Sequence, residues 1–243
     1  MLETAKRNGD FSTTNWSVVL EAGRTDTGRA ALALERLCAK YWHPIYVFIR
    51  RRGSSHHEAE DLAQSFFSFL LEKETVKSAD AQKGKFRSFL LASLNHFLLN
   101  EWDKRRTLKR GGHLEIVSLD EAAAEKRYHM DSVEQFSPEK LFDRRWALTI
   151  IEQVLTRLKQ EYEATGKPEL FSKLEAGLTG EITPGLYAEW ATALGMNEGA
   201  VKVALHRLRR RFGELLQSEV AYTVAQPAEV ADEIRYLLAA TEI

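Results

Sequence analysis

The residues from Met196 to Phe212 offer the clearest chemistry in the sequence. They read MNEGAVKVALHRLRRRF and contain five cationic side chains, one histidine and a single acid. Lysine and arginine neutralise phosphates, and a few such side chains can also read base edges in the DNA major groove. If this segment forms a helix, it is suited to binding nucleic acid.

Helical spacing separates the apolar side chains of this segment from most of the charged ones. The apolar stripe comprises Val201, Leu205, Leu208, Phe212, Leu215 and Leu216. The opposite face carries Val203, His206, Arg207 and Arg210, with Lys202 and Arg209 along one edge and Arg211 along the other. An ordinary surface helix gives the same pattern, because lysine and arginine favour helices and charges usually face water.

The residues just before this segment favour the nucleic-acid interpretation. Tyr187–Leu194 predicts a short helix, Gly195 a tight turn, and Asn197 the N-cap of the next helix. A short helix, a glycine turn and a cationic amphipathic helix form the helix-turn-helix pattern, whose second helix enters the major groove.

Other patterns that would indicate chemistry are weak, so we expect no enzyme, no cofactor and no metal. His56 and Glu60 are four residues apart, but HExxH is absent and a capped helix start explains them as well. The KGK at Lys83 and the KRGG at Lys109 lack the context of a phosphate loop, and no GxSxG is present. Cys38 lies on an apolar helix face and is predicted to be core.

Overall composition limits the class of protein. The chain of 243 residues is 44% hydrophobic, which suits one or two domains. Its formal net charge of −1 provides no global field for polyanions, so contacts with nucleic acid must come from local clusters. A single cysteine excludes an intramolecular disulfide, and we find neither a signal peptide nor a membrane span. We therefore expect a cytoplasmic protein.

Helical periodicity recurs along the chain and strand alternation is scarce, which predicts an all-α fold of two helical domains joined by a linker. The first domain is predicted at 14–112, the linker at 113–140, the second domain at 141–221 and a C-terminal helical tail at 222–243. The predicted helices are 16–21, 28–52, 56–72, 86–106, 141–164, 169–178, 186–194, 197–220 and 228–240. In the tail, Val230, Ile234, Leu237 and Leu238 form an apolar stripe that caps the second domain or binds a partner.

The stretch ALGMNEGAVKVALHRLRRRFGELL resembles region four of bacterial sigma factors of the sigma-70 family, in particular the short extracytoplasmic-function (ECF) type. The match covers Leu194 to Leu216 with almost no gaps. Many relatives carry arginine or another polar residue where this chain has Ala204. The resemblance implies that region four binds the polymerase flap and reads minus-35 duplex DNA through Lys202, Val203, His206, Arg207 and Arg210.

The first domain resembles region two of the same family. AEDLAQSFFSFLLEK, residues Ala59–Lys73, is similar to the helix that docks on the clamp helices of the largest polymerase subunit. Ser65 stands where many members carry an acid. The resemblance implies polymerase binding through Asp61, Gln64 and Phe67.

KGKFRSFLLASLNHFLLNEWDKRR, residues Lys83–Arg106, resembles the promoter-melting helix. Its predicted buried stripe is Phe86, Leu90, Leu94, Phe97 and Leu98. The loop 78–85 corresponds to a pocket for an unstacked base. The resemblance implies contacts to the minus-10 element through Lys85, Ser88, Asn95, His96, Asp103 and Arg106. Alternatively, Asn95 and His96 hydrogen-bond a neighbouring helix.

Together these matches imply a sigma factor whose partners are core RNA polymerase, promoter DNA and an anti-sigma factor or other regulator. One alternative is a stand-alone helix-turn-helix regulator that binds an operator without polymerase. Another is an interaction protein that sequesters polymerase or a second sigma factor. No residue decides the promoter sequence or the mode of control.

Overall fold

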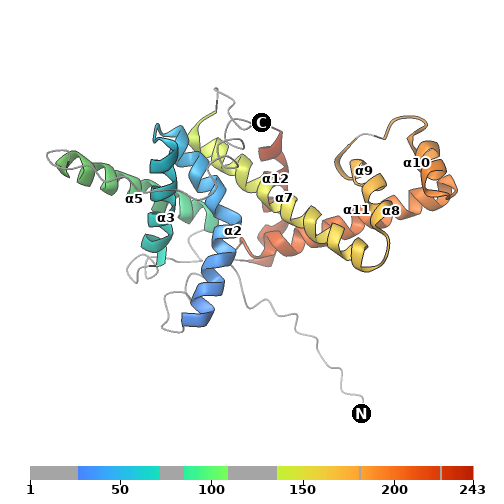
Figure 1. The fold of residues 1–243 in the computed structure, drawn as a ribbon, viewed down its shortest axis with the longest axis horizontal. Coiled ribbons are helices and arrows are strands. Elements are labelled where there is room, and N and C mark those ends of the chain that lie inside the picture. The colour runs from blue at the N-terminus through green and yellow to red at the C-terminus, as the bar shows by residue number, and fades with distance from the viewer. Residues whose placement is uncertain (1–26, 72–84, 109–135, 181, 225, 243) are drawn as a thin grey trace, which may run out of the picture. The chain divides into compact units, whose positions relative to one another are not determined.

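The computed structural model describes residues 27–71, 85–108, 136–180, 182–224 and 226–242. These residues form helices and no strand, so the all-α prediction is confirmed for the described chain (Figure 1). The predicted helix 16–21, the pocket loop as far as residue 84 and the linker as far as residue 135 lie outside the described residues.

The chain divides into two compact units. The first unit combines Met1–Ala147 with Ala221–Ile243, and the second unit is Leu148–Val220. This division differs from the predicted one, because residues 141–147 and the C-terminal tail belong to the first unit. The tail therefore does not cap the second domain, as one of the two interpretations had it.

The first unit contains α2 (Thr27–Arg51), α3 (His56–Leu71), α5 (Phe86–Leu108), the start of α7 (Pro138–Ala164) and α12 (Val230–Thr241). α2 packs on α3, and α3 packs on α5. Gly53, with φ of 92°, ends α2 in the left-handed conformation that glycine adopts without strain. Ser55 and Glu58 then cap α3 reciprocally: Glu58 N–H donates to the Ser55 hydroxyl, and Ser55 N–H to the Glu58 carboxylate.

The core of the first unit follows the predicted stripe of α5. Phe86, Leu90, Leu94, Phe97 and Leu98 are all buried. They share the interior with apolar side chains of the other helices, including Tyr41, Ile45, Phe48, Leu62, Phe66, Leu70, Phe142 and Trp146. Cys38, predicted as core, is half-buried, and burial raises the pKa of its thiol.

The second unit contains the rest of α7 with α8 (Pro168–Leu174), α9 (Ala176–Thr179), α10 (Leu186–Leu194) and α11 (Glu198–Ala221, of which Ala221 belongs to the first unit). The single helix predicted at 169–178 is wrong, because a tight turn at Glu175 separates α8 from α9. In that turn Leu178 N–H donates to the Glu175 carbonyl oxygen. The break places Gly177 directly against the side chains of Trp190 and Leu205.

Gly177→Ala is expected to destabilise the second unit. A Cβ at Gly177 would lie 2.9 Å from Trp190 Cη2 and 3.0 Å from Leu205 Cδ1. Overpacking of this kind costs about 1–3 kcal/mol. The matched control is Gly213→Ala in α11, where a Cβ meets nothing within 4 Å. Urea unfolding should place the Gly177 variant below wild type and the Gly213 variant at or slightly above it, and equal midpoints would contradict this packing.

Candidate nucleic-acid interface

The turn between α10 and α11 contains the glycine turn and the N-cap that the sequence predicted. Gly195 adopts φ of 62°, and Met196 N–H donates to the Ala191 carbonyl oxygen at 2.9 Å, which closes the end of α10. The Asn197 side chain accepts a hydrogen bond from Ala200 N–H at 2.8 Å and caps α11. Trp190 of α10 is buried, so the short helix is anchored in the core of the second unit.

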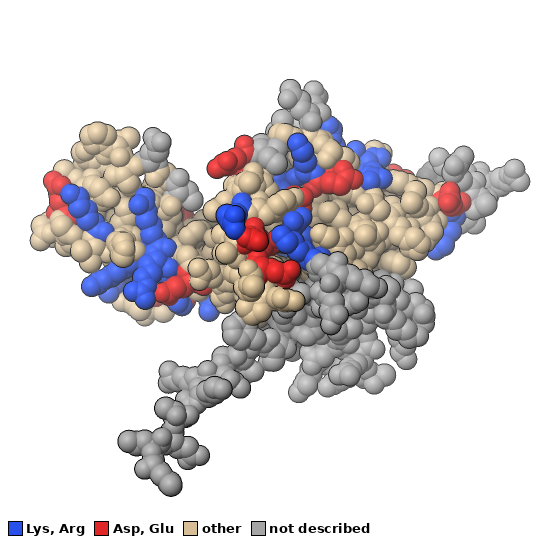
Figure 2. Space-filling model, turned by 180° about the vertical axis from the view of Figure 1, so that it is seen from behind, with Lys and Arg blue, Asp and Glu red and all other residues tan. Residues whose placement is uncertain are grey.

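Four of the five cations on α11 are exposed: Lys202, Arg207, Arg209 and Arg210. Lys202 lies 4.0 Å from Glu198 and its Nζ lies 5.1 Å from the centre of the Tyr187 ring, while Arg210 pairs with Glu214 at 3.1 Å. No acid among the described residues forms an ion pair with Arg207. Lys and Arg side chains gather along one side of this unit (Figure 2), and Lys202, Arg207 and Arg210 can reach phosphates without breaking a buried contact.

Two cations of α11, Arg209 and Arg211, hold the second unit together. Arg211 Nε and Nη2 donate to the two carboxylate oxygens of Glu161 on α7, each at 2.7 Å. Arg209 Nε donates to the carbonyl oxygen of Gly177 at 2.9 Å. A two-bond arginine–carboxylate contact fixes direction as well as distance. It therefore orients α11, and with it the solvent-facing cations, against α7.

The Glu161–Arg211 contact predicts a dependence of stability on acidity. The hydrogen bond from Arg211 holds the pKa of Glu161 below its ordinary value of 4.5. A carboxyl whose pKa falls on folding stabilises the protein above its unfolded pKa and loses this effect as the pH falls through the folded pKa. The contribution is no more than about 1 kcal/mol, because the pair is partly solvated.

Glu161→Gln should therefore destabilise the second unit at pH 7 and have little effect near pH 3. Urea unfolding at both pH values, compared with the exposed Glu163→Gln on the same helix, measures this difference. An effect of Glu161→Gln that is the same at both pH values would contradict the ion pair.

Val203 and His206, the other residues predicted to read the minus-35 duplex, are also exposed on α11. All five predicted residues therefore lie on the solvent side of one helix, away from the buried Val201, Leu205 and Leu208. A surface that contacts DNA requires this accessibility.

The residues predicted to contact the minus-10 element are only partly available. Ser88, His96 and Asp103 are exposed on α5. Asn95 accepts a hydrogen bond at 2.7 Å from Arg52, the residue that directly follows α2, in line with the alternative that the sequence left open. The Arg106 side chain lies outside the described residues.

The predicted contact of Lys85 with the minus-10 element is corrected by the structure. Its ammonium group forms an ion pair with Glu233 of α12, whose side chain is fully buried. Binding of Lys85 to a phosphate would leave the buried carboxylate with one cation fewer, which is costly. We therefore remove Lys85 from the candidate DNA contacts.

The predicted polymerase-binding residues lie on α3, and one of them is wrongly placed. Asp61 and Gln64 are exposed. Phe67 is only 4% exposed, because its ring belongs to the core of the first unit. Phe67 follows Asp61 and Gln64 at intervals of three residues, which suggests that all three share one exposed face. In the structure the Phe67 side chain faces inward. The candidate docking surface is therefore limited to Asp61 and Gln64.

A buried ionic cluster that the sequence did not indicate joins three helices of the first unit. Arg87 of α5 donates from Nε to Glu233 of α12 at 2.8 Å and from Nη1 to Asp143 of α7 at 3.0 Å. Tyr236 donates to the second oxygen of Asp143, and the Arg87 guanidinium lies 3.8 Å from the centre of the Tyr236 ring. Burial alone would lower the pKa of Arg87, but the hydrogen bond to Glu233 and the charges of Glu233 and Asp143 outweigh it and raise the pKa.

This cluster also explains why the predicted stripe of α12 is rotated. The buried residues are Glu233, Leu237 and Ala240, whereas Leu238 is 45% exposed. Helical periodicity assumes that the buried face is the apolar one. Here a carboxylate takes a core position because two cations meet it there, Arg87 of α5 and Lys85, the residue just before α5.

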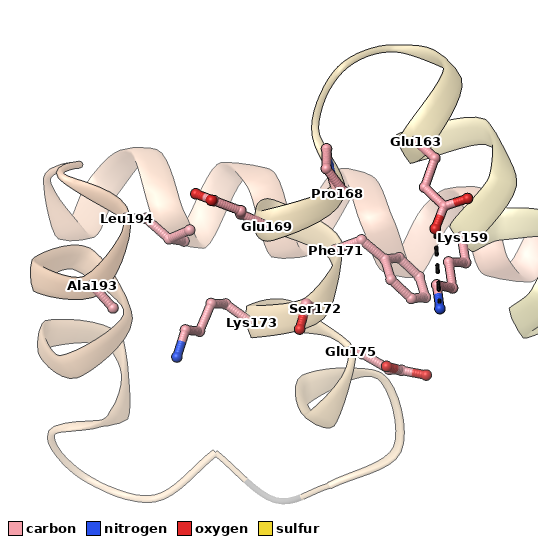
Figure 3. Close-up of a pocket in the computed structure, with 10 residues that line it drawn as sticks. All are labelled: Lys159, Glu163, Pro168, Glu169, Phe171, Ser172, Lys173, Glu175, Ala193 and Leu194. Atoms are coloured by element: carbon pink, nitrogen blue, oxygen red, sulfur yellow. Dashed lines mark ion pairs between the residues drawn. The ribbon is translucent and has the colours of Figure 1, made fainter.

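The pockets of the second unit do not gather groups that suggest catalysis. One pocket, of about 480 Å³, lies among α7, α8 and the end of α10 (Figure 3). Its charged side chains are of both signs, two lysines and three glutamates, and Lys159 and Glu163 pair with each other at 4.0 Å. Such a lining provides little net field for a charged ligand.

His56 and Glu60, weighed above as metal ligands, lie beside Tyr46 in the first unit. The Tyr46 hydroxyl and His56 Nδ1 share a hydrogen bond of 2.6 Å, and His56 Nε2 lies 3.6 Å from Glu60. Among the described residues, no three histidine, cysteine, aspartate or glutamate side chains are grouped so that they could hold a metal ion.

No family model matches the chain, and no curated protein or solved structure matches it at a significant level. None of the described helices combines the length and apolar character needed to cross a bilayer.

Proposed function

We propose that this protein is a sigma factor of the ECF type. It binds core RNA polymerase, directs it to a two-part promoter and helps to open the minus-10 element. The observation that carries the proposal is α11. It is the second helix of a helix-turn-helix, it is capped by Asn197, and it presents Lys202, Arg207 and Arg210 to solvent. The resemblance of residues 194–216 to sigma region four adds the promoter assignment.

In this proposal the DNA contacts divide into two kinds. Lysine and arginine contacts to phosphates set the register of α11 on the duplex and carry no sequence information. Side chains that face the groove read bases, and arginine paired with guanine is the commonest such contact. The polymerase supplies the catalysis, so the protein itself needs no catalytic residue, cofactor or metal.

The first unit contributes the polymerase contact and the minus-10 surface. Asp61 and Gln64 are exposed together on α3, where region two docks in the family that the sequence resembles. Ser88, His96 and Asp103 are exposed on α5 and offer polar groups to a single strand. Such a protein works in the cytoplasm with polymerase, promoter DNA and an anti-sigma factor or other regulator as partners.

The test is run-off transcription with purified core polymerase on a pool of promoter fragments, with and without the full chain. We expect discrete start sites that require the protein and that disappear when Asp61 and Gln64 are both changed to Ala. The matched control changes Gln160 and Glu175, an exposed amide and an exposed acid of the second unit, to Ala. The control should retain the start sites.

Loss of the start sites in both double variants would overturn the assignment of Asp61 and Gln64 as the polymerase contact, because general damage would then explain the effect. Absence of any start sites, together with sequence-selective duplex binding without polymerase, would identify a stand-alone regulator instead.

A further inference from the structure

Val203 is an unusual residue for the cationic face of α11. Its side chain is 51% exposed, although valine is usually buried. It lies on the face that presents Lys202 and Arg207, and it does not contribute to the buried stripe formed by Val201 and Leu205. Packing within the second unit therefore does not explain its presence.

Val203 lies in a groove whose surface is apolar near the valine and carries cationic side chains beside it. Val203, Ala200 and Ala204 line this groove, of about 770 Å³, between the first half of α11 and the turn that joins α7 to α8. Arg207 and Lys167 also line this groove. Ala200 lies one turn before Val203 and is too small to cover it, which agrees with the 51% exposure of the valine.

The charges beside this groove favour DNA over an apolar protein segment. Lys202, Arg207 and Arg210 are exposed on the same helix. Cations that can be neutralised by phosphates strengthen binding to a duplex, whereas an apolar partner would have to desolvate them. The groove is also lined by Leu170, Leu194, Met196 and the acid Glu169, so it is the exposed cations, rather than the size of the apolar patch, that favour DNA.

In the major groove only one base offers an apolar group to such a side chain. Thymine carries its C5-methyl there, while the other bases present donors and acceptors that valine cannot satisfy. We propose that Val203 is a specificity-determining residue that reads a thymine methyl in the duplex bound by α11. This inference rests on the proposed function, because it takes α11 to be a recognition helix.

The test removes single methyl groups from the DNA. The full chain first selects duplexes from a randomised pool, with core polymerase and, separately, without it. Each thymine of the selected sequence is then replaced in turn by deoxyuridine, which lacks the C5-methyl. We expect one replacement to weaken binding about fourfold, the factor that corresponds to one buried methylene-sized group.

The variant Val203→Ala separates a methyl contact from an effect on DNA shape. In this variant the same deoxyuridine replacement should have no further effect, while Val203→Ile should keep the methyl preference. Val203 is exposed, so neither change should affect folding, and an unchanged unfolding midpoint verifies this. His206→Ala, on the same exposed face, should leave the deoxyuridine effect intact.

The outcomes distinguish the inference from the function on which it rests. A selected sequence without a methyl-sensitive thymine, or a methyl effect that persists in Val203→Ala, overturns the inference and leaves the sigma assignment standing. A third outcome is that a sequence is selected only in the absence of polymerase, and that the effect of its thymine methyl depends on Val203. This outcome supports the inference and overturns the sigma assignment. Failure to select any sequence overturns both.

Discussion

Glu233→Ala is expected to lower the free energy of unfolding of the first unit by about 3–5 kcal/mol, the usual cost of removing one partner of a buried ion pair. Glu233 is fully buried and accepts a hydrogen bond from Arg87 at 2.8 Å. Its other carboxylate oxygen faces Lys85. Without Glu233, Arg87 keeps Asp143 alone as its ionic partner, and the Lys85 charge loses its buried partner.

Hydrogen exchange read by mass spectrometry can locate this loss within the molecule. Amides of α5 and α12 should exchange faster in Glu233→Ala, whereas those of α10 should be unchanged. Asp232→Ala is the matched control. Its exposed carboxylate pairs, among the described residues, only with Arg235 on the same helix, so its loss should change stability by no more than about 0.5 kcal/mol. Equal exchange in both variants would show that the buried cluster does not stabilise the unit.

Arg207→Ala is expected to weaken minus-35-dependent transcription by about 1–3 kcal/mol, or roughly 5- to 150-fold, without loss of stability. Arg207 is exposed, and no acid among the described residues forms an ion pair with it. Removal of the Arg207 side chain therefore breaks no ion pair with an acid among the described residues. Run-off transcription on a promoter selected by the wild-type chain measures the first effect, and urea unfolding the second.

Arg211→Ala provides the comparison for Arg207→Ala. It removes the same charge from the same helix, but Arg211 is bound to Glu161 by two hydrogen bonds of 2.7 Å. We expect a stability loss of about 0.2–1 kcal/mol and a smaller loss of transcription than for Arg207. Similar transcription losses in the two variants would indicate that α11 contributes only general charge.

The helices could be predicted because their signals are local. The glycines Gly53 and Gly195 mark helix ends, and Asn197 caps α11, so the predicted bounds differ from the observed ones by a few residues at most. The stripe of α5 was confirmed residue by residue. The exception is the break at Glu175, where the sequence has no residue that typically ends a helix.

Which cations are available could not be predicted, because that depends on residues far away in the sequence. Arg207 and Arg211 look alike on a helical wheel, and Glu161, which binds Arg211, lies fifty residues upstream. Lys85 and Arg87 are likewise held by Glu233, near the other end of the chain. Charge pairing has no periodicity, so Lys85 had the pattern of a DNA contact, and no local signal indicated that α12 belongs to the first unit.

The return of α12 to the first unit also determines when each unit can be completed during protein synthesis. Domains generally fold in the order in which they leave the ribosome, beginning at the N-terminus. Here every residue of the second unit is translated before Glu233, so the second unit can finish folding while Arg87 and Asp143 still lack their partners from α12. The unit that begins the chain is therefore the last to be completed, and until then it exposes an unfinished core to chaperones and proteases.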